Sequence, residues 1–206
     1  MTIRPITAFA QVTIGLGVFA VVVGVNFATS LAAEAKVPVS FSGGHEIGTK
    51  DYGRPVVLIA AALEVKPDVF REAFSGVTPA RGRGPSRDEA RKNKAALMKV
   101  LAPHGVTNER LDEVSNYYRY QPQRGELWPT APATAHAIVE NGKIKRIVVT
   151  DPGSGYSSPP DVMVKGFQNT EFKVTLEFSK DLKKNGTIAA VDVVSPKKPK
   201  TGRSVP

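Results

Sequence analysis

The chain of 206 residues contains no cysteine. It therefore has no disulfide, no thiol nucleophile, no cysteine-ligated zinc and no thiol redox chemistry, and its stability has to come from packing alone. Histidine is almost as scarce: the three histidines lie in separate segments, without the local spacing of a zinc-binding pair. The serines of the glycine-rich loop 153–158 miss the Gly-x-Ser-x-Gly pattern of a nucleophile elbow. The sequence therefore predicts no metal site, no cofactor and no assembled set of catalytic residues.

Charged side chains are absent from residues 5–33, and only Arg4 precedes this stretch. It contains an apolar block of the length of a signal-peptide core, and a small-x-small cleavage site follows at 33–35. We therefore expect residues 1–35 to be a signal peptide and the mature protein to be secreted or periplasmic. The alternative is an uncleaved membrane anchor that leaves the protein facing outward, because residues 12–33 are long enough to cross a hydrocarbon core of about 30 Å.

The basic charge belongs to the predicted mature chain. The net charge is +9, and residues 1–35 contain one positive and one negative side chain, so their removal leaves it unchanged. Export and the lack of a recognition motif argue against nucleic acid, and favour an anionic envelope polymer or lipid headgroup as the partner. Solvated surface charge without a partner is the alternative. The candidate contacts for an anionic partner are Arg81, Arg83, Arg87 and Arg91.

Helical patterns follow an extended, glycine- and serine-rich arm at 36–52. Four helices are expected, with starts at Pro55, Pro67, Ser86 and Thr107. The first is apolar on all sides and should be buried, and the third begins with a capping box in which Ser86 and Glu89 satisfy each other's backbone N–H groups. We interpret the four helices as two helical hairpins.

A segment at 121–132 is rich in proline and glutamine. After it, apolar residues alternate with polar ones, which is the pattern of a β-strand. Asn141-Gly142 between alternating residues predicts an antiparallel hairpin with a type I′ turn, and Asn185-Gly186 predicts a second hairpin. The sequence therefore predicts an α+β fold in which the helices come first. Its expected parts are a helical domain at 36–120, a linker at 121–132, an antiparallel β domain at 133–195 and a disordered basic tail at 196–206.

One segment of the β part resembles a known repeat. Asn141-Gly142, the strand 147–150, Gly153-Ser154-Gly155-Tyr156 and the strand 162–164 follow one another in an order that is similar to a β-rich repeat of bacterial and phage surface proteins. The resemblance covers residues 135–164 and implies a structural, non-enzymatic module without catalytic residues. The chain as a whole resembles uncharacterised exported bacterial proteins.

Four of the six tyrosine and tryptophan residues lie within twelve positions. They are Tyr117, Tyr118, Tyr120 and Trp128. Such amphipathic rings can form a platform for sugar rings or for a protein partner. The alternative interpretation is that they pack the last helix onto the β part.

Together these features predict an exported, non-catalytic binding or structural protein of the cell envelope or extracellular space. An anionic envelope polymer, a glycan or another envelope protein is the expected partner. A first alternative is a secreted glycan hydrolase, because such an enzyme needs two carboxyl groups about 5–10 Å apart. Its candidate carboxylates are Glu109, Asp112, Glu113 and Glu126. A second alternative is a membrane-anchored adaptor, which requires that the N-terminal segment is retained.

Overall fold

The structure is a computed structural model that describes residues 34–78 and 84–194. All of these belong to one compact unit, Ala32–Pro206. The predicted signal peptide or anchor lies outside the described residues except for its last two positions. The predicted tail at 196–206 lies outside them as well. Over the described residues the mixed α+β class is confirmed, with antiparallel strands throughout.

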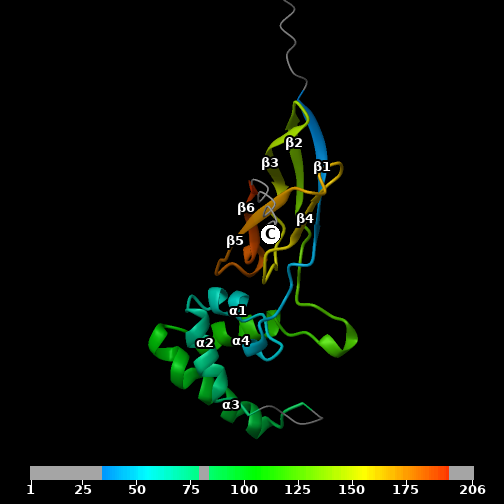
Figure 1. Ribbon diagram of the computed structural model, residues 1–206. Helices are drawn as coiled ribbons and strands as arrows, with labels where there is room; N and C mark the ends of the chain where they lie inside the picture. Colours follow the sequence, from blue (N-terminus) through cyan, green and yellow to red (C-terminus); the bar gives the residue numbers. More distant parts are fainter. Residues whose placement is uncertain (1–33, 79–83, 195–206) are drawn as a thin grey trace, which may run out of the picture. The chain divides into compact units, whose positions relative to one another are not determined.

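The strands form two antiparallel sheets. They are β1 (Ala35–Ser42), β2 (Thr134–Glu140), β3 (Lys143–Asp151), β4 (Asp161–Val164), β5 (Glu171–Glu177) and β6 (Thr187–Val194). The first sheet has the order β3-β2-β1-β4, and β5 pairs with β6 in the second (Figure 1). The helices are α1 (Val56–Ala62), α2 (Pro67–Ser75), α3 (Arg87–Leu101) and α4 (Asn108–Tyr117).

The prediction that all helices precede the β part is wrong, because β1 comes before α1. Residues 36–42, expected in an extended arm, form a central strand in which Val39 pairs with both Ala135 and Val164. Proline normally argues against a central strand because it donates no ladder hydrogen bond. Pro38 is tolerated because pairing with β4 begins only at the next residue. The first strand of the sheet thus lies within the range predicted as a helical domain.

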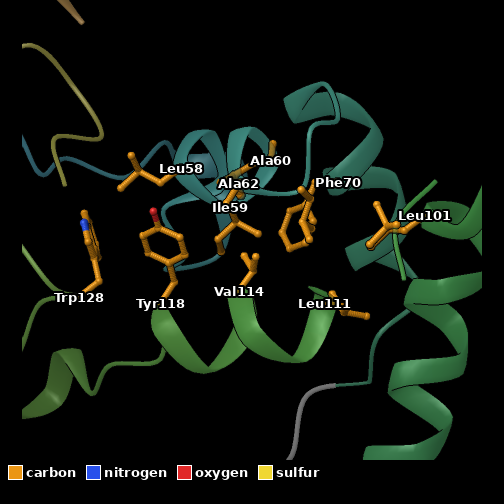
Figure 2. Close-up of a cluster of buried hydrophobic side chains, with 14 residues drawn as sticks. Leu58, Ile59, Ala60, Ala62, Phe70, Leu101, Leu111, Val114, Tyr118 and Trp128 are labelled. Atoms are coloured by element: carbon orange, nitrogen blue, oxygen red, sulfur yellow. The ribbon is translucent and has the colours of Figure 1, made fainter. Parts of the chain in front are cut away.

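The helices enclose an apolar core around α1. Five of its seven residues are buried, as the all-apolar pattern predicted. Figure 2 shows the side chains of Val114 and Tyr118 pointing from α4 towards α1, with Phe70 of α2 beside them. Leu101, at the end of α3, belongs to the same cluster. The capping box at the start of α3 is confirmed.

The two sheets pack against each other through their apolar faces. Val174, Ile188 and Val191 of the second sheet are buried against partly buried side chains of the first, including Phe41 and Ile147. Alternation of apolar and polar residues puts one face of each strand into this interior. The loop between β3 and β4 also contacts the loop between β5 and β6, where the backbone N–H of Gly155 donates to the Asn185 carbonyl at 2.8 Å.

Only one of the two Asn-Gly turns has the expected geometry. Asn141 and Gly142 have φ values of 51° and 72°, as the predicted type I′ turn requires. The hairpin of β5 and β6 also exists, but its connection covers residues 178–186 and includes a short 3-10 helix at Leu182–Lys184. Asn185 has an extended backbone, with φ −89° and ψ 134°. The expectation that Asn185-Gly186 is itself the turn is therefore wrong.

Candidate functional site

Two members of the predicted aromatic platform are buried. The exposed fractions of Tyr118 and Trp128 are 3% and 2%. The Tyr118 hydroxyl accepts a hydrogen bond of 2.9 Å from the Asn185 amide, and the indole N–H of Trp128 donates to the Gly155 carbonyl at 2.8 Å. Burial raises the pKa of Tyr118, so its phenol stays neutral. These two side chains join the end of α4 and the segment that follows it to loops of the β part.

Trp128 lies at the centre of a wider aromatic group. The Tyr120 ring meets it edge-on at a centroid distance of 5.2 Å, and the Tyr120 hydroxyl donates to the Gly53 carbonyl at 2.6 Å. On another side, His45 lies edge-on to Trp128 at 6.1 Å and stacks on Tyr156 at 5.3 Å. Burial lowers the pKa of His45. The group therefore connects the segment after β1, the segment after α4 and the loop between β3 and β4.

Asn185 is the polar residue that the sequence patterns missed. Its side chain has no exposed area. The amide nitrogen donates to the Leu58 carbonyl at 2.7 Å and to the Tyr118 hydroxyl at 2.9 Å. The amide oxygen accepts from the backbone N–H of Ser179 at 3.1 Å. One buried amide thus links α1, the end of α4 and the loop between β5 and β6.

Tyr117 is the member of the predicted platform that contributes to an open groove. The groove has a volume of about 520 Å³ and is lined by Arg110, Glu113, Asn116, Tyr117, Lys180, Asp181, Leu182 and Lys183. The half-buried Tyr117 ring is supported edge-on by Tyr118 at a centroid distance of 5.0 Å. Partial burial, followed by the charge of Asp181, raises the pKa of Tyr117 and keeps its hydroxyl protonated.

Arg110 holds the two walls of this groove together. Its guanidinium donates to the Ala62 carbonyl at 2.8 and 3.1 Å and to the Lys180 carbonyl. A third contact is the ion pair with Glu113 at 2.5 Å. Because the carbonyl of Lys180 belongs to the loop between β5 and β6, the contacts fix that loop against α4. The groove is therefore a preformed feature of the fold.

The carboxylates proposed for a hydrolase are only partly brought together. Glu113 lines the groove beside Tyr117. Asp112, the preceding residue of the helix, is paired with Lys94 of α3 at 2.6 Å. Glu126 accepts a hydrogen bond from the backbone N–H of Gln121 at 3.0 Å. Glu109 lies exposed in the first turn of α4. Asp181, which was not among the predicted candidates, is the second carboxylate that lines the groove.

The predicted basic cluster lies at the start of α3. Arg87 and Arg91 are exposed there, whereas Arg81 and Arg83 lie outside the described residues. Arg91 forms an ion pair with Asp88 one turn earlier, so part of the positive charge is neutralised locally. The exposed face of α3 remains basic because it also carries Lys92 and Lys99.

No group of three or more potential ligands within 34–78 and 84–194 is placed to hold a metal ion. Over the same ranges, no helix has the length and apolar character that crossing a membrane requires. Comparison with known proteins adds no identity: no family model, curated protein or solved structure matches the chain.

Proposed function

We propose that the chain is an exported, non-catalytic binding protein of the cell envelope or extracellular space, and that it binds a glycan in the groove beside Tyr117. The observation that carries the proposal is the groove itself, in which a supported tyrosine ring lies among polar side chains. The proposal includes a second binding surface: the basic face of α3 contacts an anionic envelope polymer. The proposal also includes the interpretation that the four helices form two helical hairpins, α1 with α2 and α3 with α4.

The chemistry of the groove suits a polyhydroxylated ligand. The flat face of a tyrosine ring can cover the apolar face of a sugar. The amide of Asn116 and the carboxylates of Glu113 and Asp181 offer the hydrogen-bond donors and acceptors that sugar hydroxyls need. The volume lies within the range of about 300–1,000 Å³ that is usual for small-ligand sites.

The arrangement of the two carboxylates favours binding over hydrolysis. Glu113 is engaged by Arg110, and Asp181 accepts a hydrogen bond of 3.0 Å from the backbone N–H of Lys183. A glycosidase needs one carboxylic acid that donates a proton to the leaving group and a second carboxylate that acts opposite it. Even so, the two carboxylates line the same groove, and a glycan hydrolase is therefore the second candidate function. The release of reducing sugar ends from the ligand distinguishes it from simple binding.

Co-sedimentation of the full-length chain with insoluble peptidoglycan, at low and at moderate salt, tests the proposal. We expect Tyr117→Ala to weaken binding about tenfold, since a central aromatic contact is worth about 1–2 kcal/mol and 1.4 kcal/mol corresponds to a factor of ten. Tyr52→Ala is the matched control, because Tyr52 is 81% exposed and lies outside the groove. Equal retention of wild type and Tyr117→Ala would contradict the proposed groove.

The predicted export has a separate test. Mass spectrometry of the protein produced with its own N-terminal segment should find a mature chain that starts near Lys36 if residues 1–35 are a signal peptide. Recovery of the intact chain in the membrane fraction would instead support the anchored adaptor. This result decides localisation, and it leaves the groove proposal to the binding assay.

A further inference from the structure

A second pocket lies where the segment after β1 meets the start of α1 and the loop between β3 and β4. Its volume is about 390 Å³, and it shares no residue with the Tyr117 groove. Apolar side chains line part of it, including Ile47 and Val56. The remainder is charged or hydroxylated, with Glu46, Arg54 and Ser158 among the lining residues. Residues more than a hundred positions apart therefore form one small, mixed-polarity cavity.

Hydrogen bonds between two chain segments hold the acidic wall of the pocket. The backbone N–H groups of Ser157 and Ser158 donate to the Gly44 carbonyl at 2.9 and 3.2 Å. The Ser157 hydroxyl donates to the Glu46 carbonyl at 2.9 Å, and the Ser158 hydroxyl donates to the Glu46 carboxylate. This last hydrogen bond lowers the pKa of Glu46, so the pocket carries a fixed negative charge at neutral pH.

The opposite charge in the pocket is Arg54. Its guanidinium carbon lies 4.3 Å from the centroid of the Phe74 ring, a cation–π contact that fixes its position. Arg54 is an exposed residue, so a ligand can reach it from solvent. Within the described part of the chain no carboxylate forms an ion pair with it. Arg71, the other arginine of the pocket, is already paired with the buried Asp51 at 2.7 Å.

We propose that this pocket binds a small zwitterion, a free amino acid or a dipeptide, with its carboxylate on Arg54 and its ammonium group on Glu46. The planar guanidinium matches a carboxylate through two parallel hydrogen bonds. A carboxylate held in place by Ser158 accepts hydrogen bonds from an ammonium group. The apolar lining at Ile47 and Val56 then contacts the ligand's side chain.

Isothermal titration of the full-length chain with alanyl-alanine tests the charge requirement without any substitution. Two analogues serve as matched ligands: the C-terminal amide, which keeps only the ammonium group, and the N-acetyl dipeptide, which keeps only the carboxylate. We expect the zwitterion to bind at least tenfold more tightly than either analogue. Inorganic phosphate is the fourth ligand, and it should bind more weakly than the dipeptide.

Substitutions at two positions then assign the charges. Arg54→Gln should weaken binding of the zwitterion and of the N-acetyl analogue about tenfold or more, and Arg54→Lys should restore part of the affinity. Glu46→Gln should weaken binding of the zwitterion while leaving or improving that of the N-acetyl analogue. Arg124→Gln, which removes an exposed arginine that lines neither pocket, is the control and should change neither.

Three results would overturn the proposal. The first is that the chain binds none of the dipeptide forms. The second is that all three forms bind equally. The third is that phosphate binds as tightly as the dipeptide and is unaffected by Glu46→Gln, which would make the pocket a plain anion site. Failure of the Tyr117 groove to bind glycan has no bearing on any of them, because the two sites share no residue.

Discussion

Replacement of Asn185 by alanine is the most direct test of how the helices are attached to the β part. The side chain has no exposed area and makes three hydrogen bonds, to the Leu58 carbonyl, the Tyr118 hydroxyl and the backbone N–H of Ser179. Alanine removes all three and leaves the Tyr118 hydroxyl in a site from which water is excluded. Three hydrogen bonds at about 1 kcal/mol each predict a loss of about 3 kcal/mol in the free energy of unfolding.

Urea denaturation of wild type and Asn185→Ala measures this loss, which is a large part of a typical stability of about 5–15 kcal/mol. Asn93→Ala is the matched control. The Asn93 amide makes two hydrogen bonds of 2.9 Å to the backbone of Thr78, but both are exposed. Water can replace them, and alanine favours the helix by up to about 0.7 kcal/mol, so we expect a loss below about 1 kcal/mol.

A double-variant cycle sharpens the test. Tyr118→Phe removes only the hydroxyl, and we expect it to cost about 1 kcal/mol. The double variant should lose less stability than the sum of the two single losses, because each single variant already removes the hydrogen bond between Asn185 and Tyr118. The reasoning fails if Asn185→Ala destabilises no more than Asn93→Ala, or if the two substitutions are simply additive.

The features that the sequence predicted correctly depend on neighbours along the chain. The capping box needs only Ser86 and Glu89, which are three residues apart. The turn at Asn141-Gly142 is determined by the φ values that these two residues tolerate. Burial of α1 follows from a run with no polar face. In each case the interaction that decides the structure lies within one turn of helix or hairpin.

The missed strand β1 depends on partners far away in the sequence. Val37, Val39 and Phe41 alternate with exposed residues, which is the pattern of a strand with one buried face. The partners of this strand lie about a hundred residues later, and Pro38 argues locally against a central position. Only the sheet shows that pairing with β4 begins after the proline.

At the second Asn-Gly pair, the two residues are required for reasons other than a hairpin turn. A Cβ atom on Gly186 would lie 2.4 Å from the Tyr156 carbonyl oxygen, so glycine is needed there for a close approach of two chain segments. Asn185 is needed for its buried amide. Hairpin chemistry predicts the same residues at these positions, so the sequence alone does not distinguish the two causes.

The candidate sites show the same limit. Composition identified the aromatic residues, but their exposure depends on what covers them: Trp128 and Tyr118 are enclosed by other segments, and Tyr117 lines a groove. The zwitterion pocket left no local pattern at all, because Glu46 and Ser158 are 112 residues apart. Strand pairing brings such distant residues together, and no spacing in the sequence predicts which of them will meet.

Two further substitutions test the loop that the helices pack on. Gly186→Ala should cost at least about 2 kcal/mol more than Gly142→Ala, because both glycines have positive φ but only Gly186 lacks room for a Cβ; equal losses in urea denaturation would exclude the steric argument. His45 stacks on Tyr156, and its burial lowers the pKa. An unfolded histidine titrates near 6.5, so below that pH the unfolded state binds the extra proton, and stability falls as the pH drops through the folded-state pKa. His45→Phe keeps a stacked ring without a titrating group. Its free energy of unfolding should therefore decline less than that of wild type between about pH 7.5 and about pH 5, and parallel declines would refute the assignment to His45.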